Sequence, residues 1–204
     1  YSLLIEIMKF ILNTSFDPHF CVLFDENDNI IDIKKWNIPR KDGFEIWHFL
    51  EKNNIQNTKL SFIGGVSGPG SFSSLRSASV ILESLAFSQK LKIHFTRTDK
   101  IINKFLEQNN CSAIPLFNTF GEAVFFQNEK KELERLPLEK ALEKFKENSV
   151  FVSLLPENKQ SFFRNKKTLP MNDIEQTCLE ILKNTPPQEK FIPDYEVPPV
   201  SINN

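Results

Sequence analysis

The chain has 204 residues and a mass of 23.7 kDa, a length that fits one or two domains. Hydrophobic residues make up 40% and charged residues 25%, which argues against a disordered, collagen-like or coiled-coil protein. Lys and Arg number 25 against 26 Asp and Glu, so the net charge is -1. A protein that binds nucleic acid on its own is usually strongly basic, and we therefore expect any role with RNA to need a partner.

The cysteines and the N-terminal apolar run bear on location. Cys21, Cys111 and Cys178 are odd in number, widely spaced and without a CxxC pair. This pattern argues against a disulfide framework and a zinc site and predicts a reducing, cytoplasmic location.

The apolar run at 3–12 contains two charged residues and is about half of the roughly 20 residues that a membrane-spanning helix needs. We expect no membrane association.

The first residues have two interpretations. Met8 directly precedes a strand-like segment, and residues 1–7 lack the basic region and the small-residue cleavage site of a signal peptide. We therefore expect Met8 to be the native start and residues 1–7 to be an upstream extension. The alternative is a longer first strand.

The first half of the chain reads as βββαβ followed by a strand and two helices. Short apolar or alternating segments predict strands, and apolar residues at helical spacing predict helices. The expected strands are 9–15, 19–24, 30–36, 60–66 and 92–96, and the expected helices are 42–52, 71–88 and 99–108. The helix at 42–52 carries an apolar stripe of Phe44, Ile46, Trp47 and Leu50.

The second half repeats this order. Strands are expected at 113–118, 122–127, 131–136 and 150–155, with a helix at 138–147 and a last helix from about 170 to 183. Both halves open with an apolar strand that ends in Asn-Thr, at Asn13 and Asn118, which indicates an internal duplication. Five prolines after residue 185 predict an extended tail. The expected organisation is a first lobe at 8–110, a reduced second lobe at 111–185 and a Pro-rich tail at 186–204.

Duplicated βββαβα lobes, each a mixed sheet flanked by helices, resemble the α/β architecture of the actin-like (ASKHA) ATPases and sugar kinases. This likeness concerns the fold and by itself says nothing about function.

Residues 67–72, Ser-Gly-Pro-Gly-Ser-Phe, lie between an expected strand and an expected helix. Such a loop can present backbone N–H groups to an anion. It lacks the lysine of a P-loop, and no GxGxxG fingerprint replaces it. A sharp strand-to-helix turn is favoured, with a phosphate site as the alternative.

The helix after this loop has a stripe of mostly small residues at helical spacing. The stripe consists of Ser74, Ser77, Ala78, Ile81, Ser84, Leu85 and Ser88. It either packs against the protein's own sheet or lets a partner helix approach closely. Arg76 either holds an acidic partner or phosphate, or pairs with an internal carboxylate such as Glu83.

Residues for catalysis or metal binding do not cluster in the sequence. His19, His48 and His94 are far apart and form no HxxxH pair. The serines around Gly70 lack a GxSxG elbow and a neighbouring base, and Ser71 is expected to be a helix N-cap. We predict no catalytic residue and no metal ligand on this chain.

The segment 68–76, Gly-Pro-Gly-Ser-Phe-Ser-Ser-Leu-Arg, is followed by Ala78 and by Leu-Glu-Ser-Leu-Ala at 82–86. It resembles the GPGSFTGLRIG…AKGLA signature of the TsaB (YeaZ) family, the bacterial tRNA threonylcarbamoyladenosine factor. Weaker matches are the opening strand at 8–15, the strand pair at 113–126, and Pro193-Asp-Tyr195 with Pro198, which resembles a Pro-x-Tyr tail. The resemblance covers nearly the whole chain from Met8.

The chain also departs from the family pattern. Asn13 replaces the usual Asp, and Asn118 opens an Asn-Thr-Phe segment where Asp-Ala-Arg is common. Ser73-Ser74 and Ser77-Ala78 replace Thr-Gly and Ile-Gly. Because amides stand where metal and phosphate chemistry would use carboxylates, ATP hydrolysis by this chain alone is not expected.

The resemblance implies a non-catalytic scaffold that dimerises with a TsaD-like catalytic subunit. With a TsaE-like ATPase, the complex would install threonylcarbamoyl on tRNA (t6A), with ATP and divalent metal bound by the partner subunits and tRNA bound through the complex. The implied partner interface is the helix at 44–52 together with Gly68, Pro69, Gly70, Ser71, Phe72, Ser74, Arg76, Ser77, Ala78 and Ile81. The alternatives are a small actin-fold ATPase or phosphotransferase and a homodimeric interaction module.

Overall fold

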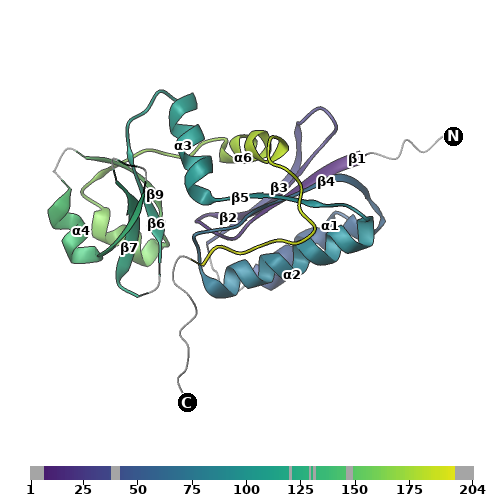
Figure 1. Cartoon of the computed structure of the whole chain (residues 1–204), viewed down its shortest axis with the longest axis horizontal. Helices are drawn as coiled ribbons and strands as arrows, with labels where there is room; N and C mark the ends of the chain where they lie inside the picture. Colours follow the sequence, from purple (N-terminus) through teal and green to yellow (C-terminus); the bar gives the residue numbers. More distant parts are fainter. Residues whose placement is uncertain are drawn as a thin grey trace, which may run out of the picture.

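Two mixed sheets of five strands each form the framework of the protein, and helices flank both (Figure 1). The computed structural model describes residues 7–37, 42–119, 121–128, 130, 132–145 and 149–195. The first sheet has the order β3 (Ile30–Trp36), β2 (His19–Phe24), β1 (Ile7–Asn13), β4 (Lys59–Val66) and β5 (Ile93–Thr96). The second has the order β10 (Lys167–Thr168), β9 (Val150–Leu154), β6 (Ile114–Asn118), β7 (Ala123–Gln127) and β8 (Leu133–Pro137).

The helices follow the predicted order, with short additions in the second lobe. They are α1 (Asp42–Lys52), α2 (Phe72–Gln89), α3 (Thr98–Gln108), α4 (Leu138–Lys144), α5 (Glu157–Gln160) and α6 (Ile174–Lys183), with 3-10 turns η2 (Ile55–Asn57) and η3 (Ser161–Phe163). The sequence pattern did not indicate α5, η3 or β10, because segments this short show no periodicity. Predictions for residues 1–6, 38–41, 120, 131, 146–148 and 196–204 lie outside the described residues.

The two sheets share one topology. In each, three strands form an antiparallel meander, and the first of them pairs in parallel with a fourth strand after a helix: β1 with β4, and β6 with β9. A fifth strand pairs in parallel with the fourth, β5 in the first sheet and β10 in the second. The duplicated, actin-like α/β fold expected from the sequence is therefore confirmed.

The first sheet is buried on both faces. Successive side chains of a strand point to opposite faces, and on β1 Phe10 and Leu12 join the apolar cluster under α1 and α2, whereas Ile11 joins the cluster under α3 and α6. This explains why β1 reads as a continuous apolar run instead of an alternating one. Figure 1 shows the resulting layers, with α3 and α6 on one side of the sheet and α1 and α2 on the other.

Helix α6 follows the second sheet in sequence but packs on the first, contrary to the expectation that residues 111–185 form the second lobe. Ile174, Cys178 and Leu182 belong to the same apolar cluster as Ile11. An ion pair between Lys35 on β3 and the buried Glu175 (2.6 Å) also connects α6 to the first sheet. An apolar helix stripe packs where an uncovered sheet face is available, and the first sheet provides that face.

The residues after α6 continue over the first lobe. We call residues 186–195 the terminal segment. Gln188 exchanges two backbone hydrogen bonds with Ile93 at the outer edge of β5, both 2.8 Å long. Phe191 is buried, packs edge-on against Phe95 (centroids 5.3 Å apart), and fills the space next to Gly65 where a Cβ would lie 2.9 Å from its ring. The described part of the predicted tail, residues 186–195, is thus extended and packs against the sheet.

None of the helices described here is long and apolar enough to cross a membrane.

Candidate functional site

The loop between β4 and α2 is enclosed by the protein's own backbone. Ser67 donates its N–H to the carbonyl of Thr96 (2.8 Å) and accepts the N–H of Asp194 (2.6 Å). Gly68 has a φ of +128°, and a Cβ there would collide with the carbonyl oxygen of Asp194. A Cβ on Gly70 would lie 2.8 Å from the carbonyl oxygen of Ser15. The glycines therefore permit close backbone packing, and the terminal segment covers the loop that a phosphate would have to reach.

Ser71 occupies the predicted N-cap position of α2, but its side chain caps no helical N–H. Its Oγ lies 3.1 Å from the Oγ of Ser73 instead. The first turn of α2 also contains no acidic residue to balance the helix dipole. The start of α2 therefore lacks both common forms of side-chain support.

The small-residue stripe of α2 divides between core and surface. Ser74 is fully buried, and the Thr14 hydroxyl donates to its carbonyl (2.9 Å). Ala78 is 1% exposed and packs in the cluster between α2 and the first sheet. Ser77 and Ile81 are half-buried. Gly68, Pro69, Ser74 and Ala78, expected at the partner interface, are thus buried within the protein itself; for Ser74 and Ala78 the own-sheet interpretation holds.

Helices α1 and α2 carry large apolar side chains on their solvent-exposed sides, where these side chains take no part in the core. On α1, Phe44 and Trp47 are 68% and 64% exposed, and on α2, Val80 and Phe87 are 61% and 88% exposed. Phe72 at the start of α2 is also exposed. We call Phe44, Trp47, Phe72, Val80 and Phe87 the α1–α2 face. Contiguous exposed apolar patches are a feature of interaction sites, which makes this face a candidate surface.

The apolar stripe predicted on this helix consists of Phe44, Ile46, Trp47 and Leu50, and the structure divides it. Ile46 is buried together with Phe49, whereas Phe44 and Trp47 are exposed. The sequence signal for this division is that α1 has two overlapping apolar stripes, whereas contact with one sheet requires only one. Arg76 is exposed on α2, one turn after Phe72.

Asn13 supports the turn after β1 in a way that a carboxylate could not. Its Nδ2 donates to the carbonyls of Phe16 (2.9 Å) and Pro18 (3.2 Å), and its Oδ1 accepts the N–H of Ser15 (3.0 Å). An ionised Asp has no donor for the two carbonyls. Asn13, which replaces the Asp of the family pattern, therefore stabilises the turn after β1.

Asn118 occupies the corresponding end of β6 and is also engaged internally. Its Oδ1 accepts a hydrogen bond from Lys159 Nζ (2.9 Å), which also donates to the carbonyls of Thr119 and Ala123. Lys159 is 7% exposed, and burial, together with the charge of Arg135, lowers its pKa to about 8. Both duplicated positions thus carry amides that hold their own turns.

A buried polar cluster joins β2 and β3 to the start of α1. His19 Nδ1 lies 2.7 Å from Asp42 Oδ1, and Trp36 Nε1 donates to the same oxygen (2.7 Å). Asp17 lies nearby, is 5% exposed, and has a pKa raised to about 6, mainly by burial. The charge of His19 opposes this rise and that of Asp42 adds to it. The cluster positions α1, and the sequence analysis missed it because the residues are far apart in the chain.

The serines singled out in the sequence have structural partners. Ser15 Oγ donates to the carbonyl of Val66 (2.8 Å), and Ser71 contacts Ser73. The histidines bond elsewhere, His19 to Asp42 and His94 to the carbonyl of Thr185 (2.9 Å). Within the part of the chain that the structure describes, no group of three or more His, Cys, Asp or Glu residues could hold a metal ion.

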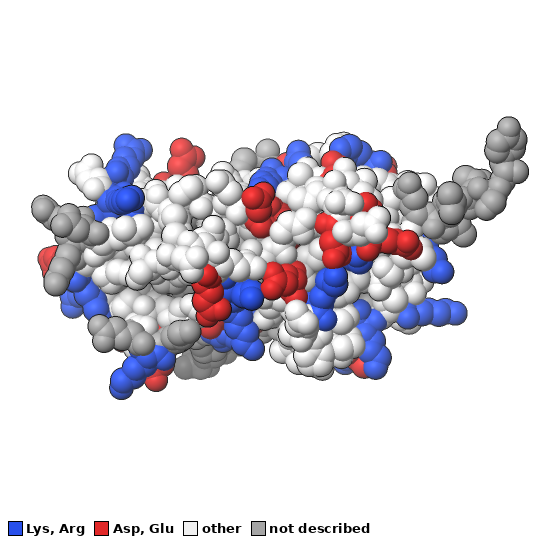
Figure 2. Space-filling model, turned by 90° about the horizontal axis from the view of Figure 1, so that it is seen from above, with Lys and Arg blue, Asp and Glu red and all other residues white. Residues whose placement is uncertain are grey.

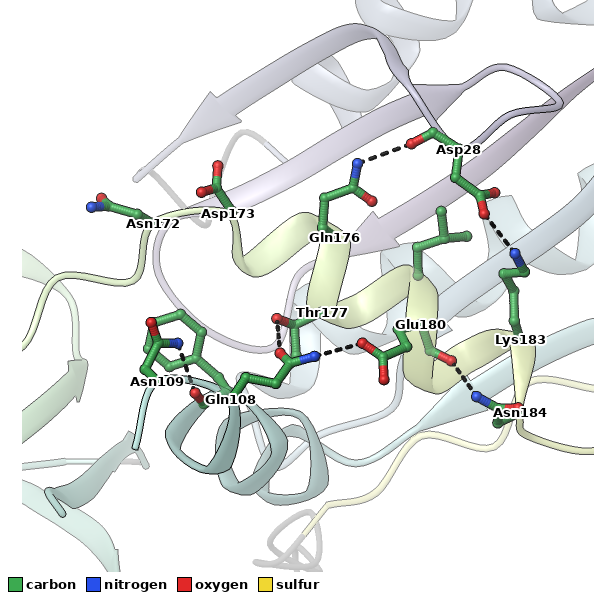
Figure 3. A pocket seen from close by; sticks show the side chains of 12 residues that line it. Asp28, Gln108, Asn109, Asn172, Asp173, Gln176, Thr177, Glu180, Lys183 and Asn184 are labelled. Atoms are coloured by element: carbon green, nitrogen blue, oxygen red, sulfur yellow. Dashed lines mark hydrogen bonds and ion pairs between the residues drawn. The ribbon is translucent and has the colours of Figure 1, made fainter. Parts of the chain in front are cut away.

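A polar pocket of about 570 Å³ lies between α3, α6 and the turn after β2 (Figure 3). Its side chains bond largely to one another. Gln108 donates to Glu180 (2.5 Å) and accepts from Thr177 (3.0 Å), and Lys183 pairs with Asp28 (2.6 Å). The polar side chains of this pocket therefore connect α3, α6 and the turn after β2 to one another.

On the face shown in Figure 2, Lys and Arg are interspersed with Asp and Glu, and no continuous basic area crosses it.

These features define a class: a protein of actin-like fold whose glycine-containing loop between β4 and α2 is covered by its own chain and whose helices α1 and α2 expose apolar side chains. No family model and no curated protein matches the chain. Among solved structures, YeaZ from Pseudomonas aeruginosa is similar, with a TM-score of 0.58 and 13% identity over 93% of this chain and 99% of that one. A second, described as "an uncharacterized protein with similarity to peptidase YEAZ from Pseudomonas aeruginosa", has a TM-score of 0.60 and 14% identity over the same shares. The likeness agrees with the resemblance seen in the sequence and confirms the fold.

Asp17→Asn should stabilise the protein near neutral pH. Below the ordinary pKa of 3.8, both folded and unfolded chains keep the Asp17 proton; between pH 3.8 and about 6 the unfolded chain ionises first. The free energy of unfolding of the wild type therefore falls by up to about 3 kcal/mol as the pH rises through this range, whereas that of Asp17→Asn does not. Urea unfolding at pH 4 and pH 7.5 tests this, and an equal difference between variant and wild type at both values would contradict it.

Ala78→Leu and Ser77→Leu should separate the buried from the half-exposed part of the stripe. Leucine at the buried Ala78 overpacks the contact with the sheet and should reduce stability by about 1–3 kcal/mol. Ser77→Leu should leave the thermal midpoint nearly unchanged. Equal melting curves for the two variants would show that Ala78 does not face the core.

Proposed function

We propose that this chain is a non-catalytic accessory subunit that binds a TsaD-like catalytic subunit through α1 and α2 and so supports t6A formation in tRNA. Three observations support the proposal: the GPGSF-type segment at 68–72, the YeaZ-like fold over nearly the whole chain, and the α1–α2 face. The α1–α2 face carries the argument, because it is the feature that a monomeric protein would not need.

The α1–α2 face suits a stable subunit contact. Phe and Trp are enriched among the residues that contribute most to interfaces, and burying such a side chain contributes about 1.5–3 kcal/mol. In Figure 1, α1 and α2 form the outer layer of the first lobe, on the side of the sheet opposite α3 and α6. A partner helix can therefore pack there without displacing any part of the described chain.

The proposed role is to stabilise the productive state of the catalytic subunit. A subunit without catalytic groups acts by binding one conformation of its partner more tightly than another. ATP and divalent metal belong to the TsaD-like and TsaE-like subunits in this proposal, and tRNA binds through the complex. The absence of a continuous basic area in Figure 2 is consistent with such a division of tasks.

The two alternatives make different use of the same features. A homodimeric module would pair the α1–α2 face with its own copy, since a self-complementary patch can close a two-fold dimer. An ATPase or phosphotransferase would need an open loop at 67–71. The terminal segment covers that loop, and Asn13 stands at the end of β1 in place of an acid, so this alternative is less favoured.

Phe87→Glu should weaken the heterodimer strongly without affecting the fold. The side chain is 88% exposed, so the charge is solvated in the free chain but buried in the complex. We expect affinity for the TsaD-like subunit to fall by about 2 kcal/mol or more, roughly 30-fold. Light scattering after size exclusion of the mixture measures this, with Phe162→Glu, an exposed apolar position in the second lobe, as the matched control.

The same experiment separates the alternatives. Binding of the TsaD-like subunit by Phe87→Glu at wild-type affinity would contradict the proposed interface. If the wild-type chain instead forms a dimer with itself that Phe87→Glu dissociates, and the TsaD-like subunit does not bind, the homodimeric module is correct.

Omitting the chain from a reconstituted reaction should reduce t6A formation although the chain has no catalytic group. A coupling free energy of about 1–3 kcal/mol corresponds to a loss of about 5–150-fold, which adding the chain back restores. Mass spectrometry of nucleosides from digested tRNA measures the product. Equal modification with and without the chain would rule out the accessory role.

A further inference from the structure

The terminal segment ends at the first turn of α2. From its hydrogen bonds to Ile93 it runs past Phe191, which is buried, to Asp194, whose side chain pairs with Arg97 and whose N–H bonds to Ser67. In Figure 1 it crosses the first lobe from α6 towards the start of α2. The last described residue, Tyr195, therefore lies beside the part of α2 that enters the proposed interface.

Tyr195 contacts the α1–α2 face directly. Its ring centroid is 4.9 Å from that of Phe72. Partial burial raises the pKa of Tyr195, and the charge of Arg76 opposes this rise. Phe72 and Arg76 are one helical turn apart, and Tyr195 packs against the turn that contains them.

This turn needs support from outside the helix. The first four N–H groups of a helix have no partner within it, and side-chain caps usually compensate. Ser71 supplies no such cap, and the first turn has no acidic residue. Contacts from outside the helix reach this turn from two sides: Thr14 donates its hydroxyl to the carbonyl of Ser74 (2.9 Å), and the terminal segment packs Tyr195 on Phe72 and bonds Asp194 to the preceding loop.

We infer that Tyr195 is a positioning residue of the partner interface: the terminal segment clamps the first turn of α2, so attachment of this segment and partner binding are coupled. The inference rests on the proposed function for the identity of the partner. It adds that the interface is composite, built from α1, α2 and the terminal segment.

Tyr195→Ala should loosen the start of α2 in the isolated full-length chain. The amide of Leu75, which donates to the carbonyl of Ser71 (2.9 Å), reports on this turn. We expect its hydrogen exchange to accelerate about fivefold or more, with the amides of α1 unchanged. Ile192→Ala is the matched control, because Ile192 lies in the same segment with its side chain 64% exposed.

The coupling itself is measured with the TsaD-like subunit. Tyr195→Ala should weaken its binding by about fivefold or more, within the range typical of coupled sites, and Ile192→Ala should not. In a Phe72→Ala background the effect of Tyr195→Ala should largely disappear, because the two side chains act as a pair. Additive effects of the two substitutions would overturn the positioning role.

Gly68→Ala provides a second variant that acts on the segment from the other side. A methyl group there collides with the carbonyl of Asp194, whereas Gly121, also at positive φ (+69°), has open space around its Cβ position. Gly121→Ala therefore controls for a methyl group added at a positive φ without a collision. Gly68→Ala should accelerate exchange at Leu75 and weaken partner binding, and Gly121→Ala should do neither.

The outcomes distinguish this inference from the proposed function. If the wild-type chain does not bind the TsaD-like subunit, the proposed function fails, and the exchange at Leu75 still decides whether the segment clamps α2. If the wild type binds but Tyr195→Ala exchanges and binds like Ile192→Ala, the inference is wrong and the proposed function stands.

Discussion

The first sheet must be covered on both faces, and the rest of the molecule is arranged around that requirement. Phe10 and Leu12 of β1 require an apolar layer on one side, and Ile11 requires one on the other. Helices α1 and α2 meet the first need, and α3 meets part of the second. The chain returns from the second lobe to complete it with α6, which follows the second sheet in sequence.

The return of α6 determines where the C-terminal residues lie. A chain that leaves α6 above the first sheet passes the open edge of β5, and Gln188 pairs there with Ile93. Unpaired strand edges favour such additions. From this point the segment reaches the glycine loop, where the missing side chain of Gly68 admits the backbone of Asp194. The loop between β4 and α2, whose sequence allows an anion site, therefore packs against the backbone of the terminal segment.

Buried polar groups serve the same scaffold. Asn13 and the pair of Asn118 and Lys159 hold the turns after β1 and β6. Asp42 receives hydrogen-bonding partners from β2 and β3 and so sets the position of α1. Positions at which the family pattern has carboxylates thus maintain the geometry of the lobes and of the helices that carry the α1–α2 face.

The sequence by itself determined the order and type of the main elements, the duplication and the extended tail, because periodicity, turn residues and prolines act locally. Through the segment that resembles TsaB, it also supplied the proposal that α1 and α2 bind a partner subunit. Only the tertiary structure decided which stripe of α1 faces the sheet, that Ser74 and Ala78 are core residues, that α6 joins the first lobe, and that His19 meets Asp42. These outcomes depend on contacts between residues distant in the chain, and a helix with two apolar stripes or a small-residue stripe is compatible with either orientation until its neighbours are in place.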